Sequence, residues 1–385
     1  MKVACIMMQK NETELLKPWF HYHASIFDAS NIYILDNGST DKRVLSTLHS
    51  IESLGAKVIY EYNTNHDFER KGDIIGQLIS DLDDGSYDFF MPLDCDEFVA
   101  VYDQNGKISC EKLDIQYELN NNINSKDALV ISGQLFNCPL NNNIFHYQET
   151  RKTFFTKKSF RSLDLGYHWG KSISLGEHKT KITHFHFHNK PFNILIEHAK
   201  EKLKSRVDSF EPEYLKTYNG LGSHMVRYFL ITEDEYLTQF ENLSYIETSS
   251  IIDALDKCHE KIPYKNDLNI DLDAKGYIDN ISHDNPSSLV TFSGWTFLKC
   301  HEIKSFSIKC NDGKHYLIDT FQKVARQDVA DYLGIKEISV GFEFKLVMNP
   351  SSLSGLKVYP IFSNNIKGKP LYLNGAANAF VEKHK

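Results

Sequence analysis

Hydrophobic residues near the start of the chain fall into two alternating patterns. Short continuous apolar runs occupy residues 3–8, 31–36, 57–60 and 87–93. Between them, apolar residues recur every three or four positions, as in Leu15, Leu16, Trp19, Phe20, His23, Ile26 and Phe27. Continuous runs of this length predict buried strands, and the three-to-four spacing predicts amphipathic helices. The order β-α-β-α-β-α-β predicts an α/β fold, with a mostly parallel, Rossmann-like sheet flanked by helices on both faces.

The pattern changes further along the chain. Residues 128–131 predict one more strand, residues 137–150 an Asn-rich loop, and residues 192–260 a mainly helical segment. Turn-forming residues then make 261–288 a predicted connection between domains. After it, Val340, Phe342, Phe344, Leu346 and Met348 alternate with other side chains, which predicts strands. We therefore expect an α/β domain at 1–260, a linker at 261–288 and an all-β sandwich at 289–385.

Composition narrows the choice of function. A chain of 385 residues is long enough for two domains, and its net charge of -8 argues against binding nucleic acid by phosphate neutralisation. This charge gives no long-range attraction to anionic lipid, although local patches are compatible with it. No 18-residue apolar run occurs, so no membrane span is expected. The seven cysteines contain no Cys-x-x-Cys pair, which favours a reducing compartment, the cytoplasm or the inner face of the plasma membrane.

Two carboxylates stand where a predicted strand ends. Asp94 and Asp96, in the sequence Leu-Asp-Cys-Asp-Glu-Phe, follow the apolar run that ends at Leu93. Ligands of open α/β sheets gather at the carboxyl ends of the strands, and carboxylates there bind hard cations such as Mg²⁺ or Mn²⁺ together with substrate phosphates. The alternative for such a short motif is a solvated loop with a helix-capping aspartate.

Three histidines alternate with aromatic residues at 184–188. In a strand, this alternation places His184, His186 and His188 on one face and the phenylalanines on the other. Imidazole binds transition metals, so a histidine from this strand is a candidate to complete the coordination begun by the aspartates. A three-histidine zinc site is the rival interpretation, but it lacks a matching carboxylate or cysteine set nearby, and a surface strand is the plainer one.

Cations lie just before the histidines, in a stretch rich in glycine. Arg161, Lys171 and Lys179 are candidates for holding a diphosphate, and a solvated basic loop is the alternative. The chain contains neither Gly-x-Gly-x-x-Gly nor Gly-x4-Gly-Lys-Ser/Thr. Their absence argues against dehydrogenases and P-loop enzymes.

Taken together, these motifs resemble those of bacterial family 2-like glycosyltransferases, which have the GT-A fold and an Asp-x-Asp metal motif. The resemblance covers residues 1–205. It rests on Lys10-Asn11-Glu12, Pro18-Trp19 with Tyr22-His23, Asp36-Asn37-Gly38-Ser39-Thr40-Asp41, Leu93-Asp94-Cys95-Asp96-Glu97-Phe98, Lys171-Ser172-Ile173 and His184-Phe185-His186. The residues after 288 are similar, more loosely, to β-sandwich modules that accompany surface-polysaccharide transferases.

The resemblance implies a metal-dependent transferase that moves a sugar from a nucleotide-diphosphate donor, with UDP-sugars first among the candidates. It implies Mn²⁺ or Mg²⁺ as cofactor, held by Asp94, Asp96, His184 and His186. Nucleotide and sugar would contact Asn11, Glu12, Asp36, Asp41, Asp94 and Lys171. No Glu-Asp pair stands out as the general base, which leaves Glu97, Asp164 and Glu177 as candidates.

The expected acceptor is a glycan or a lipid-linked glycan, as in lipopolysaccharide or capsule synthesis, with peripheral membrane contact for a lipid-linked one. Two other functions compete with this one. A metal-dependent phosphohydrolase would also use an Asp-x-Asp motif with histidines, but the aspartyl-phosphatase pattern has its motif on the first strand and Thr or Val where this chain has Phe98. The other is a non-catalytic carbohydrate-binding protein.

Overall fold

The computed structural model describes residues 1–204, 206–241, 243–264, 270–284, 288–310, 314–353 and 355–384. The chain divides into two compact units, Met1–Asn266 and Asp267–Lys385. Each unit has hydrophobic clusters of its own. The division falls a few residues after the predicted end of the first domain.

The first unit is built around a seven-stranded sheet of order β13-β7-β10-β4-β1-β2-β3. Its members are β13 (Glu177–Lys179), β7 (Ala128–Ile131), β10 (Lys152–Thr156), β4 (Phe89–Pro92), β1 (Val3–Gln9), β2 (Ile32–Asp36) and β3 (Lys57–Ile59). Strands β4, β1, β2 and β3 are parallel, as predicted, whereas β10 runs antiparallel to both β4 and β7. The sheet is therefore mostly parallel, within a mixed α/β unit.

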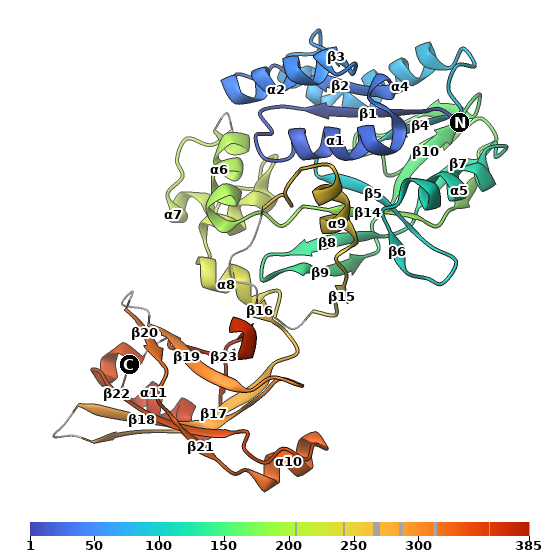
Figure 1. The fold of residues 1–385 in the computed structure, drawn as a ribbon. Helices are drawn as coiled ribbons and strands as arrows, with labels where there is room; N and C mark the ends of the chain where they lie inside the picture. The colour runs from blue at the N-terminus through green and yellow to red at the C-terminus, as the bar shows by residue number, and fades with distance from the viewer. Residues whose placement is uncertain are drawn as a thin grey trace. The chain divides into compact units, whose positions relative to one another are not determined.

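Helices cover both faces of this sheet (Figure 1). Alternate residues of β1 point to opposite sides, because successive side chains of a strand alternate. Val3, Cys5 and Met7 pack with residues of α1 (Leu16–Phe27) and α2 (Lys42–Ser53). Ala4, Ile6 and Met8 pack with residues of α4 (Lys71–Leu82), which follows the short α3 (Asn65–Glu69).

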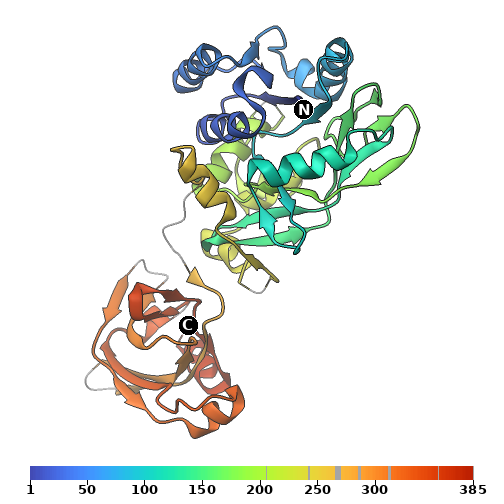
Figure 2. The same ribbon diagram turned by 45° about the vertical axis from the view of Figure 1, so that its right-hand side comes forward.

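A second sheet of six strands stands beside the first, in the order β15-β9-β8-β14-β5-β6. It comprises β15 (Ile246–Glu247), β9 (Asn141–Gln148), β8 (Gln134–Cys138), β14 (Ile182–His186), β5 (Glu97–Tyr102) and β6 (Ile108–Ser109). Strand β14 pairs antiparallel with β5, so that His186 lies opposite Glu97. Helix α5 (Lys112–Asn122) packs on β5, as Figure 2 shows.

The sequence pattern did not reveal this second sheet. Residues 137–150 were predicted to form a loop because of their asparagines, but β8 and β9 form a hairpin there. Its tertiary contacts override the weak strand preference of asparagine: Phe145 is buried, with its ring 4.6 Å from that of Phe185 on β14.

Residues 192–260 are mainly helical, as their pattern predicts. They form α6 (Phe192–Leu203), α7 (Pro212–Leu215), a 3-10 turn η2 (Ser223–Phe229), α8 (Glu233–Thr238) and α9 (Ser250–Lys257). Earlier in the chain, a small two-stranded sheet joins β11 (Phe160–Ser162) to β12 (Lys171–Ser172).

The second unit contains two five-stranded sheets that enclose one core. One consists of β16 (Ile270–Asp271), β24 (Lys367–Gly368), β23 (Lys357–Phe362), β19 (Ile303–Lys309) and β20 (His315–Ile318). The other consists of β21 (Gln322–Val324), β22 (Gly341–Val347), β18 (Leu289–Phe297), β17 (Lys275–Asp284) and β25 (Tyr372–Leu373). The ring of Phe306 lies 4.5 Å from that of Phe342 and 5.0 Å from that of Phe344, which joins the two sheets.

Two predictions for this region need correction. The predicted linker 261–288 was too long, because β17 lies inside it and pairs along its length with β18. The unit is also not all β, since it includes α10 (Gln327–Leu333) and α11 (Gly375–Lys383). Turn-forming residues misled the first prediction, since Asn280 and Asp284 occur within a paired strand.

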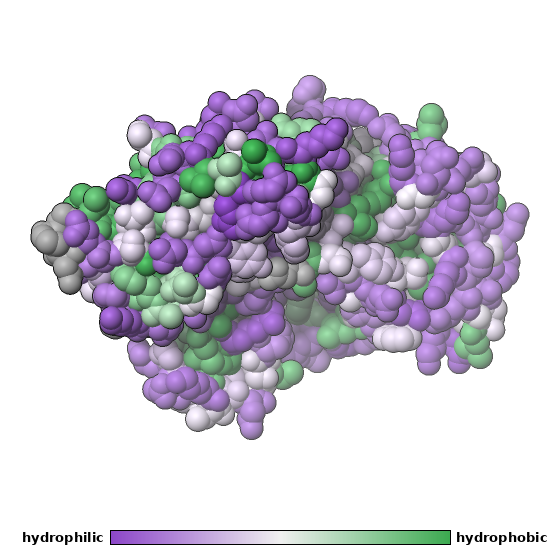
Figure 3. Space-filling model, turned by 90° about the horizontal axis from the view of Figure 1, so that it is seen from below, coloured by the Kyte–Doolittle hydropathy of each residue, from purple (hydrophilic) through white to green (hydrophobic). Residues whose placement is uncertain are grey.

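Hydrophilic residues predominate on the face drawn in Figure 3, with hydrophobic ones scattered among them. Among the described residues, none of the helices has the length and apolar character needed to cross a membrane. All seven cysteines are free thiols.

Candidate active site

Loops at the carboxyl ends of β1 and β2 are tied together by polar side chains. The buried carboxylate of Asp36 accepts hydrogen bonds from the Gln9 amide (2.5 Å) and from the backbone and hydroxyl of Ser39 (3.0 and 2.5 Å). Asn11 Oδ1 accepts the backbone N–H groups of Thr40 (2.8 Å) and Asp41 (3.0 Å). Asn11 and Asp36 therefore hold the shape of this edge through bonds within the protein.

Asp41 begins α2 and accepts the Arg43 backbone N–H at 2.8 Å. The Arg43 guanidinium also contacts this carboxylate, and these bonds lower the pKa of Asp41 to about 2. Both oxygens of Asp41 are thus engaged by its own helix. Asp41 therefore caps the helix. Its expected contact with a nucleotide stays a prediction.

The first aspartate of the motif is held by two ammonium groups. Asp94 Oδ1 lies 2.7 Å from Lys71 Nζ on α4, and Oδ2 lies 2.5 Å from Lys152 Nζ on β10. Burial by itself would raise the pKa of Asp94, but the two lysines outweigh it and hold the pKa below its ordinary value. With both oxygens in ion pairs, Asp94 is less free to bind a metal than the sequence suggested.

Glu97 is completely buried beneath the motif. One carboxylate oxygen accepts the Asp94 backbone N–H at 2.9 Å, and the other lies 3.1 Å from Lys152 Nζ and 3.3 Å from His184 Nε2. Burial raises its pKa, yet Lys152 and His184 outweigh burial and hold the pKa of Glu97 well below its usual range. The carboxylate therefore braces the motif from inside, away from solvent.

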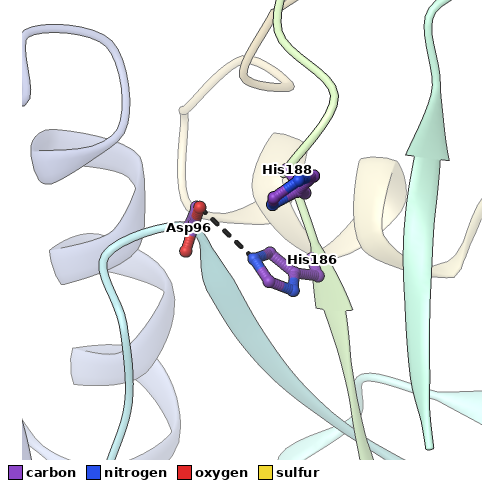
Figure 4. A group of neighbouring side chains, drawn as sticks. All are labelled: Asp96, His186 and His188. Carbon is purple, nitrogen blue, oxygen red and sulfur yellow. Dashed lines mark ion pairs between the residues drawn. The ribbon is translucent and has the colours of Figure 1, made fainter. Parts of the chain in front are cut away.

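The second aspartate of the motif faces the histidine strand. Asp96 Oδ2 lies 3.3 Å from His186 Nε2, and His188 stands beside them at the exposed end of the same segment (Figure 4). One donor atom from each of these three residues lies within 4.8 Å of the others. A carboxylate and two imidazoles at this spacing are able to share one metal ion.

Gln134 on β8 fixes the orientation of His186. Its side-chain oxygen accepts a hydrogen bond from His186 Nδ1 at 2.6 Å, so Nε2 is the nitrogen that faces Asp96. Such a partner on the far nitrogen is the usual way in which a ligating imidazole is oriented. Burial lowers the pKa of His186, but the Asp96 carboxylate outweighs it and raises the pKa above its ordinary value.

The protonation states of Asp96 and His188 suit a bound cation. Burial would raise the pKa of Asp96, but His186 outweighs it and the pKa is lowered, so this carboxylate is ionised. His188 is exposed as a residue, but partial desolvation of its ring, together with the neighbouring His186, lowers its pKa to about 4. His188 is therefore a neutral imidazole with a lone pair to donate.

His184 belongs to a second grouping, with Glu97 and His186, which lies deeper in the protein. It is completely buried; its Nε2 lies 3.3 Å from a Glu97 carboxylate oxygen, and its Nδ1 lacks a hydrogen-bond partner. Burial lowers its pKa, so it is neutral. The Lys152 ammonium already lies 3.1 Å from Glu97 in this grouping, which favours Asp96, His186 and His188 as the place for a metal.

Two lysines and a histidine between residues 190 and 202 lie close to the grouping of Asp96, His186 and His188, which we call the outer grouping. Lys190 Nζ is 2.9 Å from His198 Nδ1 and 3.8 Å from Glu12 Oε2. Lys202, on α6 like His198, has its pKa lowered by desolvation and then by Lys190, while Asp96 and Glu12 oppose this shift. Glu12, with its pKa raised mainly by burial, is the expected nucleotide residue that lies nearest to these groups.

Three expected residues lie outside the grouping of Asp96 with the histidines. Asp164 closes a turn, accepting the backbone N–H groups of Gly166 (3.2 Å) and Trp169 (2.6 Å). Glu177, on the outermost strand β13, pairs with Arg151 at 2.7 Å. Lys171 is exposed on β12. Within the described part of the chain, no ion pair joins these three residues to Asp94, Asp96 or the histidines.

Several site residues were not identified from the sequence, namely Lys71, Lys152, Gln134, Lys190, His198 and Lys202. Lys152 is the one that left a signal, because it is a cation at the start of an apolar strand and Lys and Arg are almost never fully buried unless paired. Comparisons of the chain with protein-family models and with curated proteins give no match. The geometry of the site therefore carries the functional argument.

Proposed function

We propose that the first unit is a GT-A-type glycosyltransferase, which moves a sugar from a nucleoside-diphosphate donor, foremost a UDP-sugar, to a glycan acceptor. One observation carries the proposal. Asp96, which follows β4, meets His186 and His188 at the end of β14, on the side of the sheet where β1 and β2 also end. Ligand sites of open α/β sheets lie at such an edge.

The residues present fit a divalent metal. Asp96 is ionised, His188 is neutral, and His186 is oriented by Gln134 with Nε2 forward. These three side chains would hold Mn²⁺ or Mg²⁺, which when bound supplies Lewis-acid stabilisation of a departing diphosphate. Asp94 and His184, also expected as ligands, are instead engaged by Lys152 and Glu97, which form an ion pair with each other.

Lys190 and Lys202 supply the positive charge that a diphosphate needs, whereas His198, whose pKa is lowered to about 4 mainly by burial, is a neutral imidazole beside Lys190. The two lysines lie within electrostatic reach of Asp96 and Glu12, on the chain segment that follows the histidines. Cations placed where negative charge develops stabilise a leaving group. In this proposal Lys190 and Lys202 bind the diphosphate, the role expected from the sequence for Arg161, Lys171 and Lys179.

None of the three carboxylates expected as a general base has a suitable place. Glu97 is sealed beneath the motif, and the carboxylates of Asp164 and Glu177 are engaged by neighbouring groups of their own. A base must come within hydrogen-bond reach of the acceptor hydroxyl. The proposal therefore treats Glu97 as a positioning residue for Asp94, and it names no base.

An aspartyl phosphohydrolase is disfavoured by the state of Asp94. Such an enzyme attacks with the first aspartate, but both oxygens of Asp94 are in ion pairs with lysines. The motif also follows β4 rather than the first strand. A non-catalytic carbohydrate-binding protein stays as an outcome of the experiment below.

The test measures nucleoside diphosphate released from a panel of activated sugars, with Mn²⁺ and a glycan acceptor mixture. We expect release from at least one UDP-sugar, and a loss of about a hundredfold or more in Asp96→Asn. Asp73→Asn is the matched control, because Asp73 is an exposed aspartate of the same unit and should leave the rate unchanged. Release of inorganic phosphate from phosphomonoesters, or no release with any donor, would overturn the proposal.

A further inference from the structure

The connection between β10 and β14, residues 157–181, exposes an unusual number of large apolar side chains. Leu165 is 51% exposed, Trp169 63%, Ile173 64% and Leu175 64%. These four occur within eleven consecutive residues. Scattered single hydrophobic residues on a surface need no explanation, but a concentration of this kind points to a binding surface.

The same connection is basic, although the chain as a whole is acidic. It contains six Lys and Arg residues and two acidic ones, in a chain whose net charge is -8. Five of the cations make no ion pair with any other described residue: Lys158, Arg161, Lys171, Lys179 and Lys181. All five are exposed. The local field is therefore opposite in sign to that of the whole protein.

The connection is held in a defined shape. Strands β11 and β12 pair within it, and the Ile173 backbone N–H donates to the Ser159 carbonyl at 2.8 Å. Trp169 stacks under the Arg151 guanidinium, 4.2 Å from ring centre to Cζ. Green loops at the edge of the first unit, at the right of Figure 2, show this part of the chain. Its apolar side chains are thus presented to solvent by an ordered backbone.

We propose that this surface docks on an anionic phospholipid bilayer. Leu165, Trp169, Ile173 and Leu175 would enter the interface, with the five unpaired cations among the lipid head groups. Each Lys or Arg near an anionic surface strengthens binding, and tryptophan is favoured at the depth of the head groups. A protein partner with acidic residues would use the same charges, but the bilayer also accounts for an exposed tryptophan in the same connection as the unpaired cations.

The connection also reaches the candidate site. Tyr167, between Leu165 and Trp169, is buried, with Lys71 Nζ 4.7 Å and Lys152 Nζ 5.0 Å from the centre of its ring. These are the two lysines that hold Asp94. Docking through this loop would bring the site close to the bilayer, where a lipid-linked acceptor lies. The docking itself does not depend on the proposed transferase activity.

Trp169 gives a direct test with the unmodified protein. The chain has three tryptophans, of which Trp19 and Trp295 are buried, so a change of environment at the surface reports on Trp169. We expect a blue shift of its emission, and quenching by bromine-labelled lipid, with vesicles of phosphatidylcholine and phosphatidylglycerol. Vesicles of phosphatidylcholine alone should give neither. Trp169→Phe should lose the signal but still sediment with the anionic vesicles.

Charge reversal tests the electrostatic part. Lys158→Glu/Arg161→Glu/Lys179→Glu should bind anionic vesicles at least about a hundredfold more weakly, because three attractive charges become repulsive. Lys107→Glu/Lys261→Glu/Lys336→Glu makes the same change in net charge at exposed lysines elsewhere and should bind like wild type. Equal binding by both triple variants, or an unshifted Trp169 spectrum with anionic vesicles, would overturn the proposal.

Discussion

Lys152 and Asp94 form the ion pair around which the candidate site is built: Nζ on β10 lies 2.5 Å from Oδ2, and the same ammonium lies 3.1 Å from Glu97. One cation from an antiparallel strand thus neutralises two of the three acidic residues at 94–97. The remaining acidic residue, Asp96, is the one that faces the histidines. This division of roles leads to the first prediction.

Replacing Lys152 by Met should destabilise the protein strongly. Removing one partner of a buried pair leaves an uncompensated charge, which costs about 3–5 kcal/mol of unfolding free energy. Urea unfolding of Lys152→Met against wild type measures this cost. Lys158→Met, at an exposed lysine nearby, should change stability by less than about 0.5 kcal/mol. Equal small losses in both variants would show that the ion pairs of Lys152 do little for the fold.

Metal affinity should depend on the grouping of Asp96, His186 and His188. Asp96→Asn and His188→Ala should each weaken Mn²⁺ binding by at least about tenfold, because both side chains belong to the outer grouping. His178→Ala, at an exposed histidine on β13, is the control. Mn²⁺ titration followed by electron paramagnetic resonance gives the dissociation constants. A loss confined to Asp96→Asn would show that His188 is not a metal ligand.

Among divalent ions, Mn²⁺ should act at a lower concentration than Mg²⁺. The outer grouping offers two imidazole nitrogens and one carboxylate, and Mg²⁺ prefers oxygen ligands. We expect Mn²⁺ with UDP to raise the melting temperature at concentrations where Mg²⁺ with UDP does not. The His188→Ala variant should narrow this difference, and identical titrations for the two ions in wild type would contradict the ligand assignment.

His23 should make stability depend on pH, because its ring is neutral in the folded protein. Its Nδ1 donates to the Trp19 carbonyl at 2.8 Å, and its Nε2 accepts the Val99 backbone N–H at 3.3 Å, so the folded ring must be neutral. Burial lowers the pKa of His23 from its ordinary 6.5 to about 3. Between these values the unfolded chain binds a proton that the folded chain excludes, so stability falls as the pH drops below 6.5.

From pH 7.5 to 5.5 this proton alone should cost about 1.4 kcal/mol of unfolding free energy. Other buried histidines add to the pH dependence of the wild type. The measurement is therefore the difference between wild type and His23→Gln, each unfolded in urea at the two pH values. The variant should lose less stability than wild type on acidification, and parallel losses would rule out His23 as a titrating group.

The first unit should fold without the second. Its clusters contain residues of the first unit alone, and the core that unites the two sheets of the second unit contains residues after 266. A chain ending at Asn266 should unfold cooperatively, with a smaller urea m-value than the whole protein because less surface becomes exposed. It should also keep any release of nucleoside diphosphate. Aggregation of this shorter chain on expression would show that the units depend on each other.

The sequence determined much of the first sheet. Continuous apolar runs predicted β1, β2, β3 and β4, and helical spacing predicted α1, α2 and α4. A strand buried on both faces is apolar at successive positions, whereas a helix buried on one face is apolar at every third or fourth position. The same logic located Asp94 and Asp96 at the carboxyl edge and put His184 and His186 on one strand, although His188, predicted on the same strand, lies just after its end. These are local relationships, set by residues a few positions apart.

Tertiary structure alone decided what each of these residues does. Lys71 and Lys152 form ion pairs with Asp94, although they lie 23 and 58 residues away from it in the chain. The pairing of β14 with β5 brings His186 to Asp96 and buries His184 against Glu97. The second sheet, with its β8–β9 hairpin, likewise depends on partners far away in the chain. Ion pairs and strand partners between distant segments leave no period in a single sequence, so these contacts emerge only when the chain is folded.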